Sequence, residues 1–117
     1  MTAGIYNAVM DQGSLWTLQV TYEDNTGTPI NLTNTTAKMQ LRSQPQDTVV
    51  ALTLSSANGD IVITPLTGII SITATSAQTG AVDEGTYFYD LEITDTASGE
   101  DTRIIQGQII VSAEVTR

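Results

Sequence analysis

Residues 83–94 read DEGTYFYDLEIT, a turn signal followed by a segment in which two sets of side chains alternate. One set is aromatic or aliphatic and comprises Tyr87, Tyr89, Leu91 and Ile93. The other set comprises Phe88, Asp90, Glu92 and Thr94. Because side chains alternate across a strand with a period of two, this segment is predicted to form a half-buried antiparallel strand.

The turn in front of this strand has a pattern of its own. Asp83, Gly85 and Tyr87 form the sequence Asp-x-Gly-x-Tyr, which resembles the corner before strand F of an immunoglobulin-like sandwich. In that corner a tyrosine hydroxyl bonds back to the backbone a few residues upstream. We therefore expect these three residues to form a structural corner.

The rest of the chain repeats the same alternation in short segments. We expect strands in residues 5–10, 14–23, 37–42, 50–55, 61–63 and 70–74, and a final long strand that includes residues 105–111. Ser76 is a candidate N-cap for one helical turn between the strand over residues 70–74 and the strand that contains Tyr87. About seven to nine strands with frequent turns predict an all-β fold, an immunoglobulin-like antiparallel β-sandwich, as one domain over residues 1–117.

The composition excludes several classes of function. The 117 residues contain neither cysteine nor histidine, so disulfides, thiolate chemistry and histidine general bases are ruled out. The net charge of −9 disfavours contact with nucleic acid and with anionic membranes. Two interpretations of the acidic excess stay open: it keeps the chain soluble, or it presents an acidic face to a basic partner.

The carboxylates in the strand after Tyr87 are the first candidates for chemistry. Asp90 and Glu92 have the residue types of an acid–base pair, but two carboxylates on the solvent side of a strand are typical of a solvated face. If residues 37–42 pair beside this strand, Lys38 and Arg42 are expected to form cross-strand ion pairs with the two carboxylates.

Three oxygen-rich loops are the candidates for metal binding. They are Asp24–Asn25, Asn58–Asp60 and Asp95–Asp101, and none of them matches a calcium-loop pattern. Asp- and Asn-rich turns also form without metal. The serines have no base to activate them in a chain without histidine. We expect no catalytic residue, no cofactor and no metal ligand, although a calcium-dependent carbohydrate-binding module remains an alternative.

A few large side chains indicate where a partner could bind. Trp16 shares a face with Leu18 and Val20, so it is predicted to be core, with a role as an interface anchor left open. By alternation some apolar residues point away from the expected core, which is typical of an interaction surface. The candidate interface residues are Ile69, Ile104, Ile110 and Phe88.

Three blocks of sequence resemble a family of small virion proteins encoded by tailed bacteriophages. The first block lies within residues 24–33 and consists of Asp24 and the run Gly27-Thr28-Pro29-Ile30-Asn31-Leu32-Thr33. The second block is Ala37-Lys38-Met39-Gln40-Leu41-Arg42-Ser43. The third joins Tyr89-Asp90-Leu91-Glu92-Ile93 to Thr102-Arg103-Ile104-Ile105-Gln106-Gly107 and to the ending Val111-Ser112-x-Glu114-Val115-Thr116-Arg117. The first two blocks also look like the immunoglobulin-like N-terminal domain of phage baseplate upper proteins, which attach receptor-binding proteins to the tail.

The resemblance implies a non-enzymatic building block of a phage particle. We expect a tail-associated adaptor between the tail body and a fibre or spike, assembled in the bacterial cytoplasm and located in the virion. A capsid decoration protein on the head lattice is the alternative within the same class. The expected partners are other tail, fibre or capsid subunits, or a second copy of the chain, with no nucleic acid and no membrane.

Overall fold

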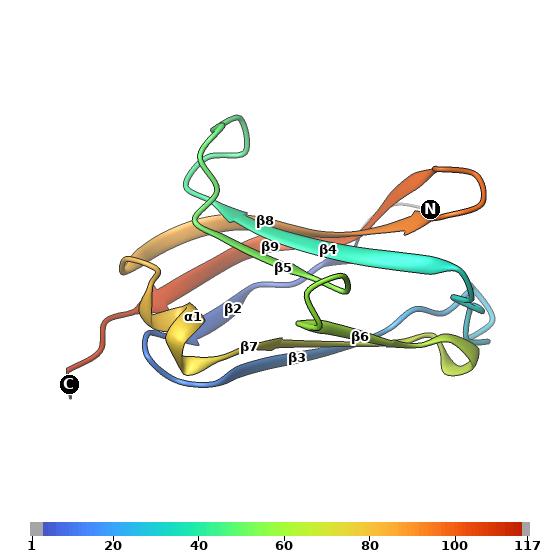
Figure 1. Ribbon diagram of the computed structural model, residues 1–117, viewed down its shortest axis with the longest axis horizontal. Helices are drawn as coiled ribbons and strands as arrows, with labels where there is room; N and C mark the ends of the chain where they lie inside the picture. Colours follow the sequence, from blue (N-terminus) through green and yellow to red (C-terminus); the bar gives the residue numbers. More distant parts are fainter. Residues whose placement is uncertain (1–3, 116–117) are drawn as a thin grey trace.

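The computed structural model describes residues 4–115 and contains two β-sheets packed face to face (Figure 1). The larger sheet contains β1 (Gly4–Ile5), β2 (Ala8–Asp11), β4 (Thr35–Arg42), β5 (Leu52–Ser55), β8 (Gly85–Asp95) and β9 (Asp101–Ser112). The smaller sheet contains β3 (Trp16–Thr21), β6 (Ile61–Thr64) and β7 (Ile69–Ala74). A short 3-10 helix, η1 (Pro65–Thr67), and one helical turn, α1 (Ser76–Gly80), lie in the connections. No helix among the described residues has the length and apolar character to span a membrane.

The strand order is that of an immunoglobulin-like sandwich, which confirms the predicted fold class. The larger sheet runs β1-β9-β8-β4-β5, and the smaller runs β3-β7-β6. In immunoglobulin terms these sheets correspond to strands G, F and C on one side and B, E and D on the other. One pairing departs from the predicted antiparallel pattern: β1 and β2 run parallel to β9. Parallel pairing needs a long crossover, and here the whole intervening sandwich provides it.

The core lies between the sheets and takes alternate residues from each strand. Its fully covered side chains include Met39 and Leu41 of β4, Leu91 of β8 and Ile70 and Ile72 of β7. These strands bury one face and expose the other to solvent or to a loop, so a two-residue period in the sequence marks them. The predicted inward-facing sets of β4, β7 and β8 are confirmed.

Trp16 belongs to this core, as predicted. Its side chain is buried, and its indole N–H donates to the backbone oxygen of Val9 at 3.1 Å. The bond ties β3 of the smaller sheet to β2 of the larger one. Leu18 and Val20, which share the inward face of β3, are only half-buried.

Ile104 is a correction to the predicted interface set, because it is only 9% exposed and packs in the core. The cause is an irregularity in the β8–β9 pairing: Leu91 faces Ile105, but the next residue, Glu92, faces Arg103. Ile104 is therefore an extra residue, as in a β-bulge, and the alternation of β9 changes phase there. Both Ile104 and the half-buried Ile105 contact the core.

The corner before β8 contains the expected hydrogen bond. The hydroxyl of Tyr87 donates to the backbone oxygen of Asp83 at 2.7 Å, and Gly85 has a positive φ of 147°. Burial and the nearby Asp83 carboxylate raise the pKa of the Tyr87 phenol.

The predicted N-cap of the helical turn is wrong by one residue. Thr75 caps α1, not Ser76. The hydroxyl of Thr75 accepts from the backbone N–H of Gln78 at 3.2 Å, and the side-chain oxygen of Gln78 accepts from the backbone N–H of Thr75 at 2.8 Å. This reciprocal capping box needs a glutamine or glutamate three residues after the cap, and only Thr75 has one.

The predicted continuous strand over residues 5–10 is interrupted between β1 and β2. At the break, the backbone oxygen of Tyr6 accepts from the Tyr89 hydroxyl at 2.6 Å, and the side-chain oxygen of Asn7 accepts from the backbone N–H of Gln108 at 3.0 Å. Gly107 lies opposite Tyr89, and the Tyr6 oxygen occupies the space that a side chain at position 107 would need. Burial, with a smaller effect of Tyr6, raises the pKa of Tyr89 to about 12.

Candidate functional site

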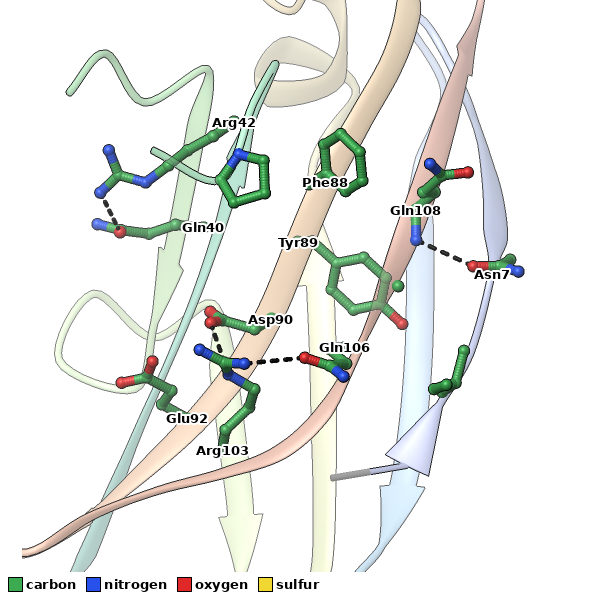
Figure 2. A pocket seen from close by; sticks show the side chains of 13 residues that line it. Asn7, Gln40, Arg42, Phe88, Tyr89, Asp90, Glu92, Arg103, Gln106 and Gln108 are labelled. Atoms are coloured by element: carbon green, nitrogen blue, oxygen red, sulfur yellow. Dashed lines mark hydrogen bonds and ion pairs between the residues drawn. The ribbon is translucent and has the colours of Figure 1, made fainter. Parts of the chain in front are cut away.

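The outer face of the larger sheet is hollowed into a groove of about 590 Å³, which we call the outer groove (Figure 2). Residues from β1, β4, β8 and β9 and from the segments that follow β1 and β4 line it. They are Ile5, Asn7, Gln40, Arg42, Pro45, Phe88, Tyr89, Asp90, Glu92, Arg103, Gln106, Gly107 and Gln108. The groove therefore combines an apolar element with several amides and with charges of both signs.

Strand register explains why these residues meet. On the outward-facing positions, Phe88 lies between Arg42 of β4 and Gln108 of β9. Two residues further along β8, Asp90 lies between Gln40 and Gln106. Side chains directly opposite on neighbouring strands lie within contact distance, so three strands assemble one continuous surface.

The charges of the groove pair differently from the sequence prediction. Arg103 forms the ion pair with Asp90, at 3.1 Å, and its guanidinium also donates to the side-chain oxygen of Gln106 at 2.9 Å (Figure 2). Within residues 4–115 neither Lys38 nor Arg42 forms an ion pair, so the expected cross-strand pairs are wrong. The irregularity at Ile104 is the reason, because it places Arg103 opposite Glu92 and beside Asp90.

Arg42 is held by neutral groups. Its guanidinium donates to the side-chain oxygen of Gln40 at 2.9 Å and to the backbone oxygen of Asp47. Lys38 lies opposite Glu92 in the β4–β8 register, and its side chain is exposed. Both cations keep a positive charge that no carboxylate of the described chain offsets by an ion pair.

The described cations are confined to this face. Lys38, Arg42 and Arg103 all project from the outer side of β4 and β9, while the fourth basic residue of the sequence, Arg117, lies outside the described residues. The chain as a whole carries 13 acidic residues. Its surface is therefore acidic in general, with this one region of mixed charge.

Glu92 is a carboxyl group of the groove whose pKa is shifted. Partial burial raises its pKa, and the neighbouring Asp90 raises it further, while Arg103 acts in the opposite direction. A raised carboxyl pKa means that the folded state binds this proton more tightly than the unfolded chain does. The stabilising contribution is complete below the ordinary value of 4.5 and is lost as the pH rises through the higher folded-state pKa.

We expect Glu92→Gln to raise the melting temperature at pH 7 and to lose this advantage as the pH falls below about 4.5. The amide removes a charge that the fold disfavours when it is ionised. Thermal unfolding followed by circular dichroism from pH 3 to pH 8 measures the difference. Glu84→Gln, on the exposed turn before β8, removes the same charge elsewhere and controls for general self-repulsion. Equal shifts for the two variants at every pH would contradict the assignment.

The four predicted interface residues do not form one patch. Phe88 lines the outer groove, and Ile110 is 51% exposed on the same face, diagonal to Phe88 across the β8–β9 pair. Ile69 is half-buried on β7 in the smaller sheet, and Ile104 is in the core. Sequence reasoning missed Ile5 and Val9, which are exposed on β1 and β2 beside β9. Parallel pairing of an N-terminal strand leaves no signal in local alternation.

The oxygen-rich loops are occupied by their own hydrogen bonds. One carboxylate oxygen of Asp24 accepts from the hydroxyl and the backbone N–H of Thr26 and from the backbone N–H of Thr28, and these bonds hold the Asp24 pKa below its usual range. Asp60 accepts from Gln78 and from the backbone of Ser55. Across residues 4–115 no three acidic side chains come together in a group that could hold a metal ion.

Comparison with known proteins shows a structural likeness but no match in sequence. No family model matches the chain, and no curated protein matches it. A solved structure of a family 123 glycoside hydrolase from Clostridium perfringens is similar over 100% of this chain, with 14% sequence identity and a TM-score of 0.40. The chain spans about a quarter of that protein's length, since the aligned part covers 24% of it. A likeness at this level carries no functional argument, and the outer groove remains the candidate site on its own geometry.

Proposed function

We propose that this chain is a non-enzymatic structural subunit of a tailed-phage particle, and that it docks a neighbouring virion protein in the outer groove. The observation that carries the proposal is the makeup of that groove: an aromatic side chain, Phe88, flanked by amides and by Arg42, a cation that lacks a carboxylate partner within the described chain. A surface of this kind binds by contact. The role we favour is a tail-associated adaptor between the tail body and a fibre or spike.

The charges indicate what the docked segment carries. Arg42 lies opposite Phe88, and Lys38 lies on the same strand two pairs further along the sheet. A partner segment with an apolar side chain against Phe88 and a carboxylate against Arg42 satisfies both groups. Arginine and aromatic side chains, phenylalanine included, are each enriched at protein interfaces. The docked segment is therefore an apolar, acidic segment of a neighbouring particle subunit.

The sequence blocks that resemble the phage family support the same location. The second block forms most of β4, and the third supplies the centre of β8 and the first half of β9. Thr116 and Arg117, at the end of the third block, lie outside the described residues. The three strands are neighbours in the sheet, and their outward side chains line most of the outer groove. The second and third blocks therefore overlap with the candidate docking surface, whereas the first block, residues 24–33, contributes no lining residue.

Particles assembled with altered chains test the proposal. We expect the double variant Phe88→Ala, Arg42→Ala to reduce the amount of this chain in purified particles by at least about tenfold, because hot-spot truncations cost about 2 kcal/mol or more. Quantitative mass spectrometry of gradient-purified particles gives the copy number. Val62→Ala, an exposed apolar truncation on the smaller sheet, is the matched control and should be incorporated normally.

The same measurement separates the two positions in the particle. A copy number near one per capsomer would place the chain on the head lattice as a decoration protein, and a small fixed number per particle would place it in the tail. Absence of the chain from purified particles, or normal incorporation of the double variant, would sink the proposal. Cross-linking of intact particles then identifies the neighbour at the groove.

A further inference from the structure

β3 forms an open edge of the smaller sheet. Among the described residues it pairs only with β7, as the strand order β3-β7-β6 shows (Figure 1). In a full immunoglobulin-like sandwich, strand A flanks strand B in this sheet. Here the N-terminal strands β1 and β2 instead pair with β9 in the larger sheet. The position beside β3 is therefore vacant in residues 4–115.

The backbone groups on this edge can be identified from the register. Tyr22, directly after β3, donates its N–H to the backbone oxygen of Gly68 at 2.8 Å, on the β7 side. Because backbone direction alternates along a strand, Thr17, Gln19 and Thr21 point their N–H and C=O groups away from β7. Within residues 4–115 these groups have no hydrogen-bond partner, and all three residues are exposed.

Natural edge strands normally carry protection against pairing, and β3 has none of it. Its sequence, WTLQVT, contains no charge and no proline, and its pairing with β7 runs without a bulge. The opposite edge of the same sheet differs. β6 has only four residues and lies between Asp60 and Pro65. One edge of this sheet is short and blocked, and the other presents six uncharged residues.

The surroundings of β3 are also suited to a neighbouring strand. Its outward residues and those of β7 beside it, Ser71 and Thr73, are uncharged in a chain with a net charge of −9. Its inward residues Leu18 and Val20 remain half-buried because no strand covers them on the open side. An added strand would complete their burial and bond the free backbone groups.

We propose that β3 pairs antiparallel with β3 of a second copy of this chain, which joins the two smaller sheets into one continuous sheet across a twofold axis. The symmetric register that bonds all free groups is centred on Gln19. It places Gln19 against Gln19 of the second copy, Thr17 against Thr21 and Leu18 against Val20, with about six backbone hydrogen bonds. This inference concerns a different surface from the outer groove and does not depend on the proposed docking function.

The absence of charge on β3 favours a second copy as the occupant. In the Gln19-centred register the nearest carboxylates on the strand, Glu23 of each copy, lie about 27 Å apart, well beyond the Debye length of about 8 Å at physiological salt. Along the strand itself, like charges therefore add little repulsion between the two copies. The edge also matches itself in side-chain size, since threonine faces threonine and leucine faces valine.

A charge swap at position 19 tests the register directly. Sedimentation equilibrium of the full chain should detect a dimer, and Gln19→Lys or Gln19→Glu should each weaken it at least tenfold, because like charges then face each other. An equimolar mixture of the two variants should restore dimers of wild-type affinity or better. Ser71→Lys places the same charge on the same face of β7, outside the new contact, and should dimerise like the wild type.

Amide hydrogen exchange provides a second readout that needs no substitution. The N–H groups of Thr17, Gln19 and Thr21 should exchange fast in dilute protein and slow down as the concentration passes the dimer dissociation constant. A wild-type chain that stays monomeric at millimolar concentration would overturn the proposal. Dimers that ignore the charge swap, or that leave these three amides fast, would show that another surface or another partner strand is used.

Discussion

Gly107→Ala is expected to lower the free energy of unfolding by about 1–3 kcal/mol, the range measured for a side chain forced into an occupied space. A Cβ atom at this position would collide with the backbone oxygen of Tyr6. That oxygen cannot move freely, because it accepts from the Tyr89 hydroxyl at 2.6 Å and the next residue is bonded to Gln108. The added methyl group therefore pushes the break between β1 and β2 away from β9.

The loss of stability should be concentrated at the break between β1 and β2. Hydrogen exchange should quicken at the Tyr6 amide, which donates to the backbone oxygen of Gln106 at 2.9 Å, and at the Gln108 amide. Chemical denaturation measures the total change in the free energy of unfolding. Gly99→Ala is the control: Gly99 also has a positive φ, of 75°, but an added Cβ would meet nothing within 4 Å. Equal losses for the two variants would mean that backbone conformation alone, and not the Tyr6 contact, requires glycine at position 107.

Ile104→Ala should cost about 2–5 kcal/mol, as expected for a large aliphatic side chain truncated in a core. Ile110→Ala, on the same strand, should change stability by no more than about 0.5 kcal/mol. The two side chains differ in exposure, 9% against 51%. Domains of this kind have a total stability of about 5–15 kcal/mol, so the first variant risks a large unfolded population, whereas the second should behave like the wild type.

This pair of variants isolates the irregularity in the β8–β9 pairing, because residue type, strand and substitution are the same. Urea unfolding followed by tryptophan fluorescence is suitable, since Trp16 is buried in the same core. If both variants lost only a little free energy of unfolding, Ile104 would have to lie on the outer face, and the change of phase in β9 would be rejected. Similar large losses would instead place Ile110 under a covering segment.

The features that depend on local periodicity can be predicted from the sequence. Tyr87, Leu91 and Met39 lie on strands with one buried face, so their burial follows from a two-residue repeat that any short window reveals. The tyrosine corner is equally local, because donor and acceptor are only four residues apart. Phe88 was placed on the outer face by the same reasoning.

The features that depend on pairing between distant strands could not be predicted from the sequence. The phase change at Ile104 arises from a register slip against β8, and a single extra residue reverses the outward and inward sets without altering the residue types. The ion pair of Arg103 with Asp90 follows from that slip, so the predicted partners Lys38 and Arg42 were wrong. The break at Tyr6 depends on Tyr89, which is 83 residues away, and on the still more distant Gly107, and no local pattern encodes it.

The parallel course of β1 and β2 along β9 has a mechanical consequence. Gly4 pairs with Ile105 near the start of β9, and Asp11 pairs with Ser112 at its end, so the chain enters this pairing at one end and leaves it at the other. Tension applied between the two ends would shear all these backbone bonds together and would not unzip them one at a time. A subunit pulled by neighbours at both ends would therefore resist a high force and then unfold in one abrupt step.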